Sequence, residues 1–195
     1  MKQTPNIFSF LIIFMCLICF WKSSANAAFL YPSKPQLSID GSGKVICLSK
    51  AVDSKTLQTT IQGSWGNSFP SQMTSITDPE KFHVRDPILT SSSSAKATTK
   101  AAAVWMAKDL TTENHVIQGT LLTALGWKIP AFTLSLNDKS EQPRNDYQVT
   151  ISQDGETIIV TWSSFIQSLN DTVPRCVMSK NGGLTWSPPV NMIIP

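Results

Sequence analysis

The sequence predicts an all-β protein made of about three four-stranded antiparallel repeats that follow an N-terminal signal peptide. Segments rich in Val, Ile, Thr and Trp alternate with polar clusters, and no long apolar stripe of helical period stands out. Glycine turns, tryptophans and prolines recur in the same order along the chain, which is typical of repeat architectures. The 195 residues, 42% of them hydrophobic, suffice for one domain or a small repeat array with an apolar core.

The C-terminal repeat is the clearest of the three. Asp154-Gly155 predicts a two-residue hairpin turn, because a type I′ turn needs positive φ at both central positions. Asn181-Gly182-Gly183 predicts a second tight turn. The expected strands are 147–151, 157–162, 174–179 and 184–186, with a polar loop over 163–172 and a final apolar segment over 190–194. Four strands in about 48 residues match the size of one β-propeller blade.

Two earlier stretches of the chain repeat this unit. Residues 36–39 and Gly43 match residues 148–151 and Gly155 with a common offset of 112. In the middle of the chain, the segment that ends at Trp105 stands where the strand over 157–162 stands in the last repeat. We therefore expect repeats over about 35–77, 86–136 and 145–194, within a mature region of 28–195.

Tryptophan spacing supports the same division and leaves two alternatives open. The tryptophans expected to close the repeats are spaced by 62 and 59 residues, and they are Trp65, Trp127 and Trp186. A non-repeating β-sandwich, in which tryptophans recur by chance, is one alternative. Residues 95–107 could also form a short helix on alanine propensity, whereas the alignment of Trp105 favours a strand.

Residues 1–27 have the organisation of a secretory signal peptide. Lys2 supplies the positive start, residues 7–21 form an apolar run, and Ala25-Asn26-Ala27 offers the small residues that a signal peptidase accepts. This run of 15 residues is shorter than the roughly 20 that a membrane span needs. We expect a secreted or periplasmic product that begins near Ala28 and has no membrane span after cleavage. An uncleaved N-terminal anchor is the alternative.

Charge and composition exclude several kinds of partner and cofactor. The formal net charge of +3 falls to +1 once Lys2 and Lys22 leave with the signal peptide, so no basic face for nucleic acid is expected. With two His and four Cys in the chain, we expect neither a metal site nor a cofactor. Cys47 and Cys176 remain after cleavage. In an oxidising compartment they could form a disulfide, or each could be a small buried apolar residue.

Residues 179–186, Ser-Lys-Asn-Gly-Gly-Leu-Thr-Trp, resemble the Asp-box or BNR repeat, Ser-x-Asp-x-Gly-x-Thr-Trp, of the sialidase-like β-propeller family. The motif positions are Ser179, Asn181, Gly183, Thr185 and Trp186, with Asn181 in place of the Asp. The side-chain oxygen of Asn181 can accept hydrogen bonds from N–H groups of its own turn, and Trp186 can pack against the neighbouring sheet. The resemblance implies a partial or open β-propeller, in which this motif is a structural device away from the ligand face.

The same resemblance makes the arginines relevant to catalysis. Sialidases, as a family, clamp a carboxylate with three Arg and use a Tyr nucleophile paired with a Glu, together with an Asp acid/base. This chain has three Arg, namely Arg85, Arg144 and Arg175, and residues 85–89 resemble the Arg-x-Pro-x-Leu stretch that opens sialidase domains. Arg85 is therefore the one catalytic candidate, and the main expectation is that there is no catalytic residue.

The remaining titratable residues are expected to be ordinary surface or connector groups. His83 and His115 are isolated in the sequence, and Arg175 is expected to be solvated or cross-strand. Glu141 lies in a mixed-charge segment that is typical of a solvated connector, and Tyr147 is not tied to a Glu by its spacing.

Three repeats do not close a propeller ring, because closed rings contain four to eight blades. An open array would present unpaired strand edges, so the repeats must assemble with other chains, belong to a longer protein, or form a compact stack. We therefore expect an exported non-catalytic repeat protein that binds a protein or glycan partner, with a homo-oligomer that completes a ring as one option. The alternatives are a sialidase-like glycoside hydrolase fragment, active only when other chains complete it, and a remnant without independent function.

Overall fold

The computed structural model describes residues 35–67 and 73–192. Within these ranges all regular structure is β-strand, and the strands form three separate antiparallel sheets. The expected all-β fold class is therefore confirmed. The expected signal peptide, residues 1–27, lies outside the described residues. No helix in the described part of the chain has the length and apolar character that crossing a membrane requires.

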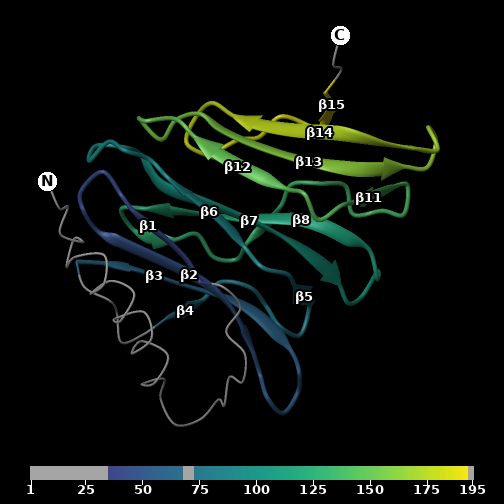
Figure 1. Cartoon of the computed structure of the whole chain (residues 1–195), viewed down its shortest axis with the longest axis horizontal. Coiled ribbons are helices and arrows are strands. Elements are labelled where there is room, and N and C mark those ends of the chain that lie inside the picture. The colour runs from purple at the N-terminus through teal and green to yellow at the C-terminus, as the bar shows by residue number, and fades with distance from the viewer. Residues whose placement is uncertain (1–34, 68–72, 193–195) are drawn as a thin grey trace, which may run out of the picture.

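Figure 1 shows the three sheets stacked in chain order, with sheet 2 between sheet 1 and sheet 3. Sheet 1 consists of β1 (Gln36–Ile39), β2 (Val45–Val52), β3 (Thr59–Gly66) and β4 (Thr74–Ser75). Sheet 2 consists of β5 (Phe82–Val84), β6 (Ile88–Ser91), β7 (Thr99–Asp109), β8 (His115–Thr123), β9 (Gly126–Trp127) and β10 (Phe132–Thr133). Sheet 3 consists of β11 (Glu141–Pro143), β12 (Gln148–Ile151), β13 (Ile158–Ile166), β14 (Asp171–Ser179) and β15 (Val190–Asn191).

The three sheets follow one plan of strand pairing. In each sheet a short inner strand, β1, β6 or β12, pairs with the beginning of a long second strand, which in turn pairs with the third. The first residues of the inner strands lie opposite Leu48, Val104 and Thr161, respectively. Because Trp105 and Trp162 directly follow the last two of these residues, they occupy equivalent positions, as the sequence predicts.

The turn after the inner strand is also repeated between sheets 1 and 3. The N–H of Gly43 donates to the carbonyl of Asp40 at 2.9 Å, and the N–H of Gly155 donates to the carbonyl of Ser152 at 3.0 Å. φ is +81° at Gly43 and +77° at Gly155, a left-handed conformation that a β-carbon would strain. The predicted match between these two glycines is confirmed.

Register decides one open alternative and corrects one expected loop. The strand favoured for the segment that ends at Trp105 is confirmed over the helix alternative for 95–107, because Thr99–Asp109 is the central strand β7 and pairs on both sides. The expected polar loop over 163–172 is wrong. Residues 163–166 lie in β13 and residues 171–172 in β14, paired with each other up to Ile166 opposite Asp171. Ladder hydrogen bonds to a long neighbouring strand therefore outweigh the polar character of this segment.

The fourth strand of sheet 3 is β15, and residues 184–186 are not a strand. The N–H of Ser187 donates to the carbonyl of Met178 at 2.8 Å, which holds the intervening segment as a turn. The three tryptophans expected to close the repeats are also not equivalent. Trp65 lies within the third strand β3, Trp127 lies in β9 after the third strand, and Trp186 follows the turn.

Apolar side chains fill the space between neighbouring sheets. Between sheets 1 and 2 the buried cluster includes Leu48, Ile61, Trp105 and Val116. Between sheets 2 and 3 it includes Met106, Ile117, Val160, Trp162 and Val177. The inner strand β6 contacts both β1 and β12, so the inner strands gather along one side of the stack. Three stacked sheets do not fit the two-layer sandwich alternative, and they bring the ends of three inner strands together.

Candidate functional site

The inner edges of sheets 2 and 3 are interrupted at the same place. In sheet 2, β5 and β6 both pair with β7, and residues 85–87 lie between them; in sheet 3, β11 and β12 both pair with β13. At each interruption an arginine N–H continues the ladder. The N–H of Arg85 donates to the carbonyl of Met106 at 2.8 Å, and the N–H of Arg144 donates to the carbonyl of Ser163 at 2.7 Å. Both arginine residues are exposed.

Local chemistry explains both interruptions. In sheet 2 the break contains Pro87, which has no N–H to donate to a neighbouring strand. In sheet 3 the carboxylate of Asp146 accepts from the N–H of Ser163 at 2.9 Å and from the Ser163 hydroxyl at 2.5 Å, so it takes the place of a strand carbonyl. Each break therefore contains a short segment that carries exposed charged residues, Arg85 and Asp86 in sheet 2 and Arg144 and Asp146 in sheet 3.

One point joins all three sheets beside Arg85. The ammonium Nζ of Lys50, from β2, lies 2.9 Å from Oδ1 of Asp86. The Tyr147 hydroxyl, next to β12, donates to the backbone carbonyl of Asp86 at 2.5 Å. Asp86 is thus tied to sheet 1 by its side chain and to sheet 3 by its main chain. We call Lys50, Arg85, Asp86 and Tyr147 the three-sheet junction.

Burial and neighbouring charges set the protonation of the groups at the junction. Burial, and to a lesser degree the negative charge of Asp86, raises the pKa of the Tyr147 phenol above its ordinary value. The phenol is therefore protonated at neutral pH and acts as a hydrogen-bond donor. Since its hydroxyl is buried and already donates to a carbonyl, it is not placed to act as a nucleophile.

The two histidines are exposed, as expected of ordinary surface residues, and they lie on either side of one lysine. His83 on β5 and His115 on β8 are both register partners of Lys108 on β7. Burial, together with the positive charges of Arg85 and Lys108, lowers the pKa of both imidazoles. Both rings are therefore neutral at neutral pH.

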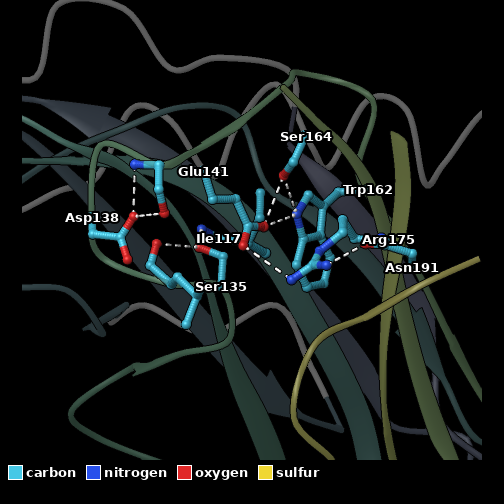
Figure 2. A network of polar contacts seen from close by, with 10 residues as sticks. Ile117, Ser135, Asp138, Glu141, Trp162, Ser164, Arg175 and Asn191 are labelled. Carbon is cyan, nitrogen blue, oxygen red and sulfur yellow. Dashed lines mark hydrogen bonds and ion pairs between the residues drawn. The ribbon is translucent and has the colours of Figure 1, made fainter. Parts of the chain in front are cut away.

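A second polar cluster is buried inside sheet 3 and ties its strands together (Figure 2). Oε1 of Glu141 accepts from Nε1 of Trp162 at 3.2 Å and from the Ser164 hydroxyl at 2.9 Å. Oε2 of the same carboxylate lies 3.2 Å from Nη2 of Arg175. Nη1 of Arg175 donates to the side-chain oxygen of Asn191. These contacts join β11, β13, β14 and β15.

This cluster corrects one expectation and decides between the two options of another. Glu141 does not lie in a solvated connector: it is 2% exposed and lies on the edge strand β11. Of the two options expected for Arg175, the cross-strand one is confirmed, because Glu141 and Asn191 on other strands bind its guanidinium. The three arginines consequently do not form one clamp. Arg85 and Arg144 occupy equivalent exposed positions, whereas Arg175 is used inside sheet 3.

The turn over 179–186 has the hydrogen bonds that its sequence predicts. Oδ1 of Asn181 accepts from the N–H of Thr185 at 2.9 Å, and Nδ2 of Asn181 donates to the Thr185 hydroxyl oxygen at 2.8 Å. The Ser179 hydroxyl oxygen accepts from the N–H of Gly183 at 2.8 Å. φ is +83° at Gly183. The Trp186 ring packs against Phe132 of sheet 2, with centroids 5.5 Å apart, so this turn anchors sheet 3 to its neighbour.

The possible disulfide between Cys47 and Cys176 is not formed. Cys47 lies on β2 of sheet 1 and Cys176 on β14 of sheet 3, and no disulfide joins these two described residues. Sheet 2 lies between them (Figure 1), so the folded chain keeps the two thiols apart. Within the described part of the chain, no group of three or more His, Cys, Asp or Glu side chains is placed to hold a metal ion.

Comparison with known proteins identifies the architecture. No protein-family model and no curated protein sequence matches the chain. The chain is similar to the solved structure of a GH93 α-L-arabinofuranosidase of Fusarium graminearum with arabinobiose. The TM-score is 0.51 at 14% sequence identity, covering 88% of this chain and 53% of that chain. The α-L-arabinofuranosidase Arb93A of the same organism, in complex with an iminosugar inhibitor, has a TM-score of 0.47 at 9% identity, covering 85% and 50%.

The chain has the fold of part of a β-propeller. It spans about half the length of the solved glycoside hydrolase structures that it resembles. In that architecture the three sheets are blades, and β1, β6 and β12 are their innermost strands. The junction therefore lies beside the innermost strands of the blades.

Sequence reasoning identified Arg85 but missed the residues around it. Arg85 and Arg144 are separated by 59 residues, close to the spacing of 57 between the equivalent Trp105 and Trp162, so the internal repeat contained a signal for their equivalence. Lys50 had no such signal, because its counterparts on the other second strands are Met106 and Ser163.

Proposed function

We propose that this chain is an exported, non-catalytic β-propeller-type protein that binds a glycan at the three-sheet junction and the adjoining Arg144. The observation that carries this proposal is the Lys50–Asp86 ion pair, which spans two blades directly beside the exposed Arg85. Export is proposed from the N-terminal leader, residues 1–27.

The chemistry of the junction suits a polyhydroxylated ligand. Sugar hydroxyls both donate and accept hydrogen bonds, and guanidinium donors beside a carboxylate acceptor match neighbouring hydroxyls. Arg85 and Asp86 provide these groups on a segment that ladder hydrogen bonds fix at both ends. The similar arabinofuranosidase was solved with the disaccharide arabinobiose, which makes a glycan the first ligand class to test.

We also propose that residues 179–186 are a divergent Asp-box. The hydrogen bonds of Asn181 support this assignment, because an amide oxygen accepts the same N–H bond that an Asp oxygen would accept. The motif stabilises the outer part of the third blade and takes no part in the proposed binding site. Lys180, on this turn, consequently offers a matched control position for tests of the junction.

A second candidate function is that the chain forms part of a glycoside hydrolase, active only when other chains complete the site. The fold shared with a glycoside hydrolase favours it. Glycosidases of most families need two carboxyl groups on either side of the scissile bond. Two exposed carboxylates lie near the junction, and both already have partners: Asp86 pairs with Lys50, and Asp146 accepts from the N–H and hydroxyl of Ser163. The second candidate function therefore requires that other chains complete the site around them.

The binding proposal is tested by calorimetry with arabinobiose and a panel of neutral and acidic oligosaccharides. We expect Arg85→Ala to weaken binding of the best ligand by about tenfold or more, because a hydrogen bond to a charged group contributes about 1.5–3 kcal/mol. Lys180→Ala should leave the affinity unchanged. Absence of binding by every glycan at millimolar concentration, or equal affinity of the Arg85→Ala variant, would overturn the proposal.

Product analysis separates the two candidate functions. The same glycans are incubated with the chain, and released sugars are measured for the unaltered protein and for Asp86→Asn. Binding without release supports a non-catalytic role. Release that disappears in Asp86→Asn would replace that role with glycoside hydrolysis.

A further inference from the structure

Each blade has a back face toward the preceding blade and a front face toward the following one, and the interface between blades 2 and 3 shows how the two faces fit. On the front of blade 2, Ala102 and Leu121 are opposite each other in register and buried. On the back of blade 3, Val149 and Ile151 of the inner strand pack against that cluster. An inner strand of the next blade therefore covers this front face.

The back face of blade 1 repeats the back face of blade 3, but it is uncovered at its inner strand. Leu37 and Ile39 of β1 hold the same register positions as Val149 and Ile151 of β12. Leu37 is 39% exposed and Ile39 is 58% exposed, whereas their counterparts pack against blade 2. The blade-stacking position is thus occupied by apolar side chains that meet no preceding blade among the described residues.

The front face of blade 3 repeats the front face of blade 2. Ile159 and Met178 are opposite each other in register, as Ala102 and Leu121 are in blade 2. Both side chains are half-buried, and Val190 on the same face is 48% exposed. The main contacts of β11 and β12 with other sheets are with β6, β7 and β8 of blade 2, on the opposite face.

We propose that the front face of blade 3 receives the back face of blade 1 of a second copy of this chain, so that two copies close one propeller ring. The repeat indicates which surface fits this face. Leu37 and Ile39 hold the register positions of Val149 and Ile151, and those two side chains cover the front face of blade 2 inside the chain. The four side chains that would meet are uncharged and apolar, as in the core of a stable interface.

Length and symmetry support a pair rather than a larger assembly. The matched part of this chain covers 53% of the similar propeller chain, so two copies would cover about the whole of it. In a two-fold ring both contacts are identical, and both exposed apolar faces of each copy are buried. Closure also removes the terminal faces that would otherwise promote further association. The proposal does not depend on what the junction binds.

The experiment measures the mass of the purified, exported chain by light scattering and sedimentation at about 1–100 µM. This range detects dimers with dissociation constants of about the same values. We expect a dimer. Ile39→Lys and Met178→Glu should each weaken dimerisation by at least about tenfold, because each leaves a charge without a partner at both contacts. The double variant should recover dimerisation, since it places opposite charges across both contacts.

Controls keep the outcome interpretable. Leu125→Lys changes a side chain that is 99% exposed in the β8–β9 turn, outside both faces, and should leave the dimer intact. Circular dichroism and the melting temperature show whether each variant is folded. Three outcomes would overturn the proposal. They are a folded monomer at about 100 µM, an assembly larger than two copies, and dimerisation that neither single variant affects.

Discussion

Trp105 in sheet 2 and Trp162 in sheet 3 hold the same place in adjacent blades, yet their indole N–H groups have different partners. Nε1 of Trp105 donates to Oε1 of Gln118 at 3.2 Å. Nε1 of Trp162 donates to Oε1 of Glu141 at 3.2 Å and to the Ser164 hydroxyl at 2.8 Å. The residue directly opposite on the third strand is Gln118 in one blade and Arg175 in the other.

The difference shows how one substitution at a buried position requires further residues. The neutral Gln118 can accept the indole N–H bond and remain buried without a counter-charge. An arginine in the same place needs a carboxylate, and Glu141 on the edge strand β11 supplies it. Sheet 3 therefore uses an ion pair and the hydrogen bonds around it at this position, whereas sheet 2 uses one neutral hydrogen bond.

The strongest way to break this comparison is Glu141→Leu. Removing the carboxylate leaves the Arg175 guanidinium buried without its counter-charge, which we expect to lower the free energy of unfolding by about 3–5 kcal/mol. Urea denaturation followed by tryptophan fluorescence measures the loss. The double variant Glu141→Leu with Arg175→Met removes both charges and should recover most of it. A single-variant loss below about 1 kcal/mol would show that the pair is solvated.

The matching change in sheet 2 is Gln118→Leu. It leaves the buried Trp105 N–H without an acceptor, so we expect the free energy of unfolding to fall by about 1–3 kcal/mol. The same urea measurement applies. A loss equal to or greater than that of Glu141→Leu would contradict the comparison, because it would show that sheet 3 does not depend on its ion pair more than sheet 2 depends on its neutral hydrogen bond.

The closing turns of the same two sheets give a smaller contrast. Asn181→Ala removes two hydrogen bonds with Thr185 and should cost about 1–2 kcal/mol. Thr123→Ala in sheet 2 removes weaker contacts, at 3.3 Å to the Gly126 carbonyl and 3.2 Å from the Leu125 N–H, and should cost about 0.5 kcal/mol. Thermal unfolding ranks the two variants, and Asn181→Asp should retain the stability of the unaltered turn. The opposite ranking would contradict the structural role of Asn181.

The smallest expected effect concerns pH, and it extends the comparison to sheet 1. Burial alone would raise the pKa of Asp40, but hydrogen bonds from Ser42, Trp65 and Lys44 outweigh burial and lower it below its ordinary value of 3.8. The carboxylate thus contributes stability above pH 3.8, and this contribution is lost as pH falls through the lower folded-state value.

Asp40→Asn tests this dependence. Sheets 2 and 3 have Ser92 and Ser152 at the equivalent position after the inner strand, and neither serine titrates. We expect urea unfolding of Asp40→Asn to change less between pH 5 and pH 3, a range of about one unit on either side of an ordinary carboxyl pKa, than that of the unaltered chain. Identical pH profiles would show that the pKa of Asp40 is the same in the folded and unfolded chains.

Much of the fold could be predicted, because local patterns determine it. The alternation over 148–151 depends on neighbouring residues alone, and the structure has it. A turn does form at Asp154-Gly155, but the predicted two-residue type I′ geometry is wrong. φ is positive at Gly155 and not at Asp154, and the N–H of Ser152 donates to the carbonyl of Thr157 across a longer connection. The equivalence of Trp105 and Trp162 followed from the repeat. The candidate site was harder to predict. Arg85 could be named from a five-residue stretch, but Lys50 and Tyr147, which bind the neighbouring Asp86, come from two other sheets.

Hydrophobic alternation and turn chemistry, which act over a few residues, were enough to establish an all-β repeat protein and the internal bonds of the turn over 179–186. The burial of Glu141, the separation of Cys47 from Cys176 and the meeting of three sheets at Asp86 became evident only once the sheets were stacked. Such features depend on which residues of different strands come within a few ångströms of each other. Strand register and sheet packing set those distances, and neither is encoded at any single position.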